Sequence, residues 1–255
     1  MNIVEAYIKF TGKLIIFVSG IIGCGKTSLA KEISDKFNLK LLDQHDYIKK
    51  DYDETITLSD GTEHINWNSD NAIDWDKLND DINKYKKNGV VVTGMALVDD
   101  KITSKPDIHI HLSISKQICI SKRRAFIEKN KEQYEDDYKY LNTQTELLKM
   151  NKMIYPYYLD AKERSKISKF INANDMTSDQ IWDSAWDILI EFFESNIDRV
   201  YKKWKQDNTG DDDESVDESD ESVDSSIKLN KKNNDSPKNG EIEFIEIEPT
   251  ILNDE

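Results

Sequence analysis

A glycine-rich segment near the start of the chain has the residue types and the spacing of a phosphate-binding loop (P-loop). Residues 20–27 read GIIGCGKT, a full match to G-x-x-x-x-G-K-[ST]. The glycines let N–H groups point at a phosphate, Lys26 is expected to reach the β- and γ-phosphates, and Thr27 to offer its hydroxyl to Mg²⁺. The motif therefore predicts binding of a nucleoside triphosphate and Mg²⁺. The predicted nucleotide-binding residues are Gly20, Ile21, Ile22, Gly23, Cys24, Gly25, Lys26, Thr27 and Ser28, with Thr27 as metal ligand.

This motif needs a buried strand before it and a helix after it. Residues 14–18 form a short apolar run that is typical of a strand covered on both faces. Residues 27–37 follow with the spacing of an amphipathic helix, which would add its positive N-terminal end to the phosphate site. The setting therefore supports the motif.

Further strands alternate with helices along the chain, which predicts a parallel α/β sheet. We expect a P-loop NTPase fold with about five parallel strands and helices on both faces. A hairpin is expected around Asp60 and Gly61, and a mobile lid near residues 120–145, polar and irregular over 131–141. After the first strand, the expected strands cover residues 39–43, 90–94, 106–114 and 168–174. The expected later helices cover residues 74–88, 115–130 and 151–165, and a closing helix is expected to begin at Thr177 or Ser178.

Charge divides the chain into two parts. The net charge is −15, and residues 206–255 carry 17 acidic and 4 basic side chains, which leaves residues 1–205 nearly neutral. We therefore predict a P-loop domain over residues 1–205 and a disordered acidic tail over 206–255. Its serines are candidates for phosphorylation, although a solvated tail is the preferred interpretation, and its last apolar–acidic stretch is a candidate strand for a protein partner.

Composition and short motifs exclude several classes of protein. Two cysteines give neither a disulfide framework nor a metal-ligand spacing, and no apolar run is long enough to span a membrane. We expect a cytoplasmic protein that binds neither membranes nor nucleic acid, because the domain is nearly neutral and the tail would repel phosphates. The sequence has no N-K-x-D segment of the kind that reads guanine in GTPases. His109 and His111 alternate on an expected strand, where packing or a surface face is the preferred interpretation.

The order of several further segments resembles the uridine kinase and nicotinamide riboside kinase group of P-loop kinases. The likeness spans residues 14–165, and only the P-loop is specific by itself. The matching segments are LLDQHDYIKKD (41–51), NWNSDNAID (66–74), VVVTGMALV (90–98), SKRRAFI (121–127) and MIYPYYLDAKE (153–163).

The resemblance implies transfer of the γ-phosphate of ATP to the 5′-hydroxyl of a nucleoside or riboside. The candidate catalytic residues are then Lys26, Asp46, His45, Arg123 and Arg124. The two arginines are expected either to close over the transferring group or simply to form an exposed basic face. The candidate substrate-binding residues are Asp43, Tyr47, Trp67 and Asn68, with Tyr47 and Trp67 flanking the base; packing is an equal alternative for Trp67.

The chain departs from this group at three acidic positions. His45 stands where the catalytic aspartate is expected, with Asp46 next to it; Asn68 replaces an acid that binds the ribose, and Thr93 replaces a glutamate near the metal. A histidine can act as a base near neutral pH, and Asp43 is an alternative acid near Mg²⁺. Two other functions therefore stay open: a kinase of another small hydroxyl metabolite, and an ATP-binding pseudo-kinase that acts as an interaction module.

Overall fold

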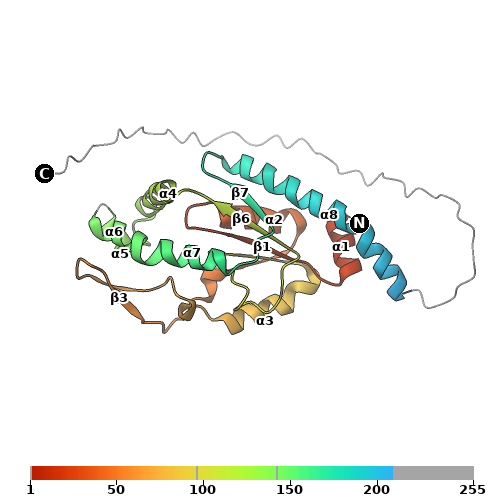
Figure 1. Ribbon diagram of the computed structural model, residues 1–255, viewed down its shortest axis with the longest axis horizontal. Helices are drawn as coiled ribbons and strands as arrows, with labels where there is room; N and C mark the ends of the chain where they lie inside the picture. The colour runs from red at the N-terminus through yellow and green to blue at the C-terminus, as the bar shows by residue number, and fades with distance from the viewer. Residues whose placement is uncertain (1, 96, 142, 209–255) are drawn as a thin grey trace, which may run out of the picture. The chain divides into compact units, whose positions relative to one another are not determined.

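The computed structural model describes residues 2–95, 97–141 and 143–208, and its centre is a five-stranded parallel sheet with strand order β2-β5-β1-β6-β7 (Figure 1). The strands of this sheet are β1 (Ile15–Gly20), β2 (Lys40–Asp43), β5 (Val90–Gly94), β6 (Ile108–Ser113) and β7 (Lys169–Asn172). A separate two-stranded antiparallel hairpin consists of β3 (Thr55–Thr57) and β4 (Glu63–Ile65). The sequence therefore predicted both the parallel sheet and the hairpin correctly.

Helices connect the strands and cover the sheet. The α-helices are α1 (Ile3–Thr11), α2 (Lys26–Phe37), α3 (Trp75–Tyr85), α4 (Lys116–Lys129), α5 (Glu135–Tyr140), α6 (Gln144–Lys149), α7 (Tyr155–Glu163) and α8 (Ser178–Asn208). The shorter turns are the 3-10 segments η1 (Gln44–Tyr47), η2 (Asp70–Ala72) and η3 (Lys86–Asn88) and the π-helical segment η4 (Met150–Ile154).

The two faces of the sheet bury different helices. On one face, β1 and β6 pack against α1, α2 and α8 through side chains that include Ile16, Ile33 and Phe193. On the other face, Ile15 and Phe17 of the same strand β1 pack against α3. Neighbouring residues of β1 thus point to opposite faces, and both are buried because a parallel sheet is covered on both sides. Figure 1 shows the sheet between α3 and α8.

The carboxyl ends of β1, β2 and β5 lie along one edge of the sheet. β1 is the central strand, and Val18 aligns with Thr93 of β5, which in turn aligns with Asp43 of β2. The side chains of Val18, Thr93 and Asp43 therefore lie on the α2 face of the sheet, because residues that are aligned across neighbouring strands point to the same face. In open α/β sheets, ligands bind at this edge.

Helices α1, α5 and α6 lie outside the helices expected from the sequence. Helix α1 begins with a capping box in which the Asn2 side chain accepts from the Glu5 backbone, a signal that an N-x-x-E search would have found. Helix α5 lies within the segment predicted to be irregular; Asp137 there is held by charged partners from other helices rather than by an apolar stripe. The last helix also continues to Asn208, past the predicted boundary after residue 205. The rest of the predicted acidic tail lies outside the described residues.

Candidate functional site

The predicted P-loop connects the end of β1 to the start of α2. Gly25 caps α2 with a φ of 93°, and Gly23 has a φ of 80°, conformations that favour glycine. Because α2 begins at Lys26, its free N–H groups and its positive end face the loop. The structure thus places the motif in the strand–loop–helix setting that phosphate binding requires.

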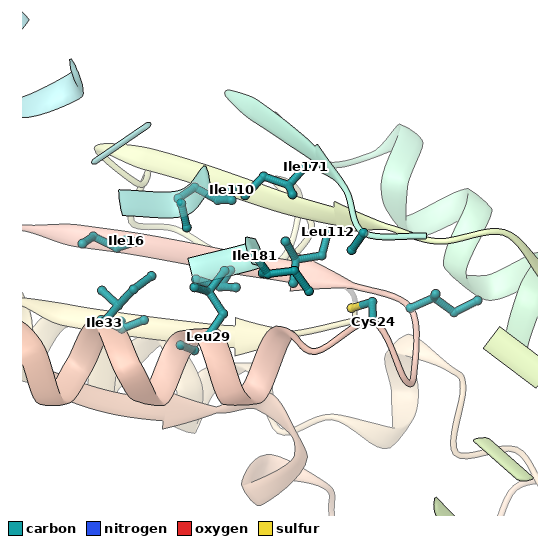
Figure 2. Packing of buried hydrophobic residues seen from close by; sticks show 14 of the residues in the cluster. Ile16, Cys24, Leu29, Ile33, Ile110, Leu112, Ile171 and Ile181 are labelled. Carbon is teal, nitrogen blue, oxygen red and sulfur yellow. The ribbon is translucent and has the colours of Figure 1, made fainter. Parts of the chain in front are cut away.

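Close packing fixes the first glycine of the loop. A Cβ at Gly20 would overlap the carbonyl oxygen of Leu112 on β6 and lie 2.6 Å from the sulfur of Cys24. Cys24 is fully buried and unpaired, and Figure 2 shows it within the packed layer that holds Leu29 and Ile181. Burial raises the pKa of its thiol, so that Cys24 has the character of a packing residue.

A group of oxygen atoms lies beside the loop on the α2 side of the sheet. The Thr27 hydroxyl is 3.4 Å from Oδ2 of Asp43, whose Oδ1 accepts a hydrogen bond from the backbone N–H of His45. Thr93, in register with Asp43, is fully buried, and its hydroxyl has no hydrogen-bond partner in the part of the chain described here. Hydroxyl and carboxylate oxygens are ligands that Mg²⁺ prefers.

The two candidate catalytic bases follow β2 in the short turn η1. His45 and Asp46 are both exposed, so both face open space at the carboxyl edge. Asp43, at the end of β2, caps this turn. The same carboxylate belongs to the group of oxygen atoms beside Thr27, so the turn with the two candidate bases begins directly at that group. Both candidates therefore directly follow the strand end that carries Asp43.

The predicted base-flanking residues lie in different environments. Tyr47 is buried in the apolar cluster on the α3 face, and its hydroxyl donates to Asp81 at 2.8 Å. Trp67 is 45% exposed and rests against the ring of Tyr52. Asn68 beside it is half-buried. In this arrangement Trp67 is available to a ligand, whereas the Tyr47 ring is committed to the core.

Arg164, which was not singled out from the sequence, holds the segment that carries Trp67 and Asn68 through its ion pair with Asp70. Arg164 follows α7 and binds Asp70 at 2.6 Å, Asp100 at 2.7 Å and Asp160 at 2.8 Å. The Tyr157 hydroxyl donates to the second oxygen of Asp70. Three carboxylates from separate segments thus converge on one arginine, which orders the loop that carries Trp67 and Asn68.

Arg123 and Arg124 have different surroundings although they are adjacent in sequence. Arg123 is buried, with Glu146 at 2.7 Å and Asp137 at 3.1 Å, and Lys149 is 2.6 Å from Asp137. Burial by itself would lower the pKa of Arg123, but these two carboxylates outweigh it and raise the pKa. Arg123 therefore belongs to a buried charge cluster that joins α4, α5 and α6, not to an exposed basic face.

Arg124 and Lys122, the neighbours of Arg123 on α4, are more accessible than Arg123. Both are half-buried, and Nε of Arg124 has no hydrogen-bond partner within the described ranges. The Lys122 Cβ lies 3.0 Å from the position that a Cβ would take at Gly23, so α4 packs directly on the P-loop. The sequence treated the two arginines alike; only their packing separates them.

A hollow of about 370 Å³ opens between the end of β7 and the start of α8. Its walls include Asn172, Asn174, Met176 and Gln180. Ile181 on the next position of α8 lies 3.7 Å from where a Cβ would stand at Gly25. The hollow was missed in the sequence because its walls join two elements that pattern analysis treats separately.

Comparison with known proteins gives fold neighbours only. No family model matches the chain, and no curated protein matches it. Solved structures similar to it include a gluconokinase from Sinorhizobium meliloti 1021, with 11% identity over 75% of this chain and 97% of that chain at a TM-score of 0.44. Another is an uncharacterized protein from Eubacterium ventriosum ATCC 27560, with 18% identity over 72% of this chain and 99% of that chain at a TM-score of 0.41. Likenesses this low establish neither a family nor a substrate for this chain.

Within residues 2–95, 97–141 and 143–208, no helix is both long enough and apolar enough to cross a bilayer.

Proposed function

We propose that this protein is an ATP- and Mg²⁺-dependent kinase that phosphorylates a small hydroxyl-bearing metabolite, with the 5′-hydroxyl of a nucleoside or riboside as the acceptor. The observation that carries the proposal is the P-loop with its three glycines, seated between a buried central strand and a helix N-terminus. Phosphoryl transfer needs positioning and charge neutralisation more than covalent chemistry, and the site offers both.

The loop and α4 supply the positive side of the site. The N–H groups at the start of α2 and the ammonium of Lys26 would hold the phosphates. Arg124 and Lys122 stand on the helix that packs against Gly23, and in this proposal they would meet the transferring group. Arg123 would act by anchoring that helix, since its guanidinium is already bound to Glu146 and Asp137.

The oxygen group beside Thr27 fits a magnesium ion. Thr27 and Asp43 would hold the ion directly or through water, and the buried Thr93 hydroxyl has an unused hydrogen-bonding capacity on the same row. When bound, the ion neutralises charge on the phosphates. Asp43 is the acid that can offset the replacement of an acidic residue by Thr93.

The acceptor hydroxyl would be deprotonated or oriented by Asp46, with His45 as the alternative. Both are exposed at the carboxyl edge and follow the strand that carries Asp43. Trp67 offers an exposed ring for stacking a base or another flat group. Its segment is held by Arg164, so that the ring has a defined place before the acceptor binds.

A second candidate is a nucleotide-binding pseudo-kinase. Three residues favour it: His45, Asn68 and Thr93 stand at positions where the resembled kinases carry acids. Such a protein would bind ATP at the same loop and transfer nothing. The two candidates therefore share a nucleotide site and differ only in turnover.

The decisive experiment measures ATP consumption by the full chain with Mg²⁺. The acceptor panel contains uridine, cytidine, nicotinamide riboside, adenosine and thymidine, with gluconate and glycerol as acceptors outside the nucleoside class. Lys26→Ala is the control, because it removes the ammonium and leaves the loop glycines in place. Turnover that depends on Lys26 and on one acceptor supports the kinase.

Other outcomes separate the alternatives. ATP binding without turnover on any acceptor favours the pseudo-kinase. Equal ATP affinity in Lys26→Ala and the wild type would refute the nucleotide site itself. For the metal, Asp43→Asn should raise the Mg²⁺ concentration needed for half-maximal activity about tenfold, since it removes the charge of the carboxylate beside Thr27. An unchanged Mg²⁺ requirement would exclude Asp43 from the metal site.

A further inference from the structure

A buried chain of polar side chains lies beneath the P-loop, on the face opposite the metal candidates. The Ser19 hydroxyl is 2.6 Å from Nε2 of His109 and 2.9 Å from Nδ1 of His111. His111 Nε2 is 3.0 Å from the Tyr158 hydroxyl, and His109 Nδ1 is 3.2 Å from the Lys166 carbonyl oxygen. The four side chains are at most 3% exposed. No step described above uses them.

The partners fix which group donates and which accepts in every hydrogen bond of this hydrogen-bond chain. Burial lowers the pKa of each histidine to about 4, so both are neutral near pH 7. The Lys166 carbonyl can only accept, so His109 carries its proton on Nδ1 and its Nε2 accepts from the Ser19 hydroxyl. Ser19 has a single proton, so its oxygen must accept from Nδ1 of His111. His111 Nε2 is left as an acceptor for the Tyr158 hydroxyl.

The hydrogen-bond chain joins β1, β6 and α7 at the point where the P-loop begins. Ser19 directly precedes Gly20, and on β6 His111 aligns with Ser19 while Leu112 aligns with Gly20. Tyr158 belongs to α7, which continues from the π-helical segment η4 and thus from α6. The hydrogen-bonded chain therefore ties the last residue before the loop to α7.

We propose that Tyr158, His111, Ser19 and His109 form a directed hydrogen-bond chain that positions the P-loop against α7. Tyr158 and His111 are then positioning residues for the nucleotide, since they act through Ser19 and do not touch a ligand. The inference rests on the proposed function, because it takes the loop to bind ATP. A fully satisfied polar chain in a dry interior specifies one arrangement of its elements, because a shift would leave buried groups unpaired.

The first test reads the histidine protons by ¹⁵N NMR of the full-length protein at pH 7. We expect Nδ1–H with an unprotonated Nε2 for both His109 and His111. A proton on Nε2 of either ring would overturn the proposed direction. In Tyr158→Phe the pKa of His111 should rise, because its neutral form loses the hydroxyl that donates to Nε2. An unchanged pKa would show that this hydrogen bond is not made.

The second test measures binding of MgATP by calorimetry at a temperature where all variants are folded. We expect about five- to tenfold weaker binding in Tyr158→Phe, the loss corresponding to one buried hydrogen bond. The matched control is Tyr155→Phe on the same helix, whose hydroxyl has no hydrogen bond to another described residue and whose loss should leave affinity within about twofold.

The outcomes distinguish the two proposals. Equal affinities in the two variants, with the expected tautomers, would refute the positioning role and leave the proposed function intact. A wild-type chain that binds no MgATP would refute the proposed function, and the positioning role with it.

Discussion

Replacement of Arg123 by methionine should destabilise the protein by about 3–5 kcal/mol, the range measured when one partner of a buried ion pair is removed. The Arg123 side chain is 8% exposed and that of Glu146 3%, so the variant would leave Glu146 as an uncompensated buried charge. Within the described ranges, Asp137 would then keep only Lys149 as an ion-pair partner. This loss is a large part of the stability of a typical domain, which is about 5–15 kcal/mol.

Urea denaturation at pH 7 gives the free energy of unfolding and checks the effect. A second variant, Arg123→Met with Glu146→Leu, should recover much of the loss, because it removes the charge that was left alone. Arg124→Met is the matched control on the same helix. It should change the free energy of unfolding by less than about 1 kcal/mol, since its guanidinium has no ion pair within the described residues, and it should lower turnover instead.

The opposite pattern would refute this reasoning. If Arg123→Met kept the wild-type free energy of unfolding and lost turnover, the result would mean that Arg123 in the wild-type protein leaves the cluster and acts on the transferring phosphoryl group. If the double variant were no more stable than the single one, the buried charge of Glu146 would not be the cause of the destabilisation.

Three further predictions follow from the strands and the first turn of the site. Stability should fall by about 2 kcal/mol for each of His109 and His111 between pH 7 and pH 5, because their pKa values are near 4 when folded and near 6.5 when unfolded, so the unfolded chain binds more protons in this window. Urea midpoints measured across this range check it, and a flat profile with native histidine pKa values near 6.5 would contradict it. Gly20→Ala should cost about 1–3 kcal/mol and weaken ATP binding, since its Cβ would overlap a backbone carbonyl oxygen of the next strand; a variant with wild-type melting and affinity would show that the loop has room. Asp46→Asn should reduce kcat more than His45→Gln does, as expected if the carboxylate is the base, and the reverse order in steady-state kinetics would make the histidine the base.

The parts of the fold that the sequence predicted are those that depend on local patterns. The P-loop is one contiguous motif, and the strand before it and the helix after it follow from apolar spacing over a few residues. The hairpin was found from Asp60-Gly61, a turn dipeptide. The same analysis missed α5, whose Asp137 is held by Arg123 and Lys149 rather than by an apolar face.

Pairings between distant residues had to come from the tertiary structure. Arg123 and Arg124 are neighbours with the same side chain, yet a helix turns successive residues to different directions, and only one of them meets Glu146. Thr27 and Asp43 were each named from the sequence, but their approach to 3.4 Å depends on how α2 and β2 meet.

The sequence by itself determined that this chain has a P-loop motif and the order of elements of a parallel α/β domain, because both follow from short-range spacing of residues. The tertiary structure decided which charged groups remain available to a ligand and which are consumed in holding the fold together. It also assembled the buried chain from Ser19 through His111 to Tyr158, whose members lie far apart in the sequence. Such contacts depend on packing between elements, and the spacing of residues along one element carries no information about the partner that another element will bring.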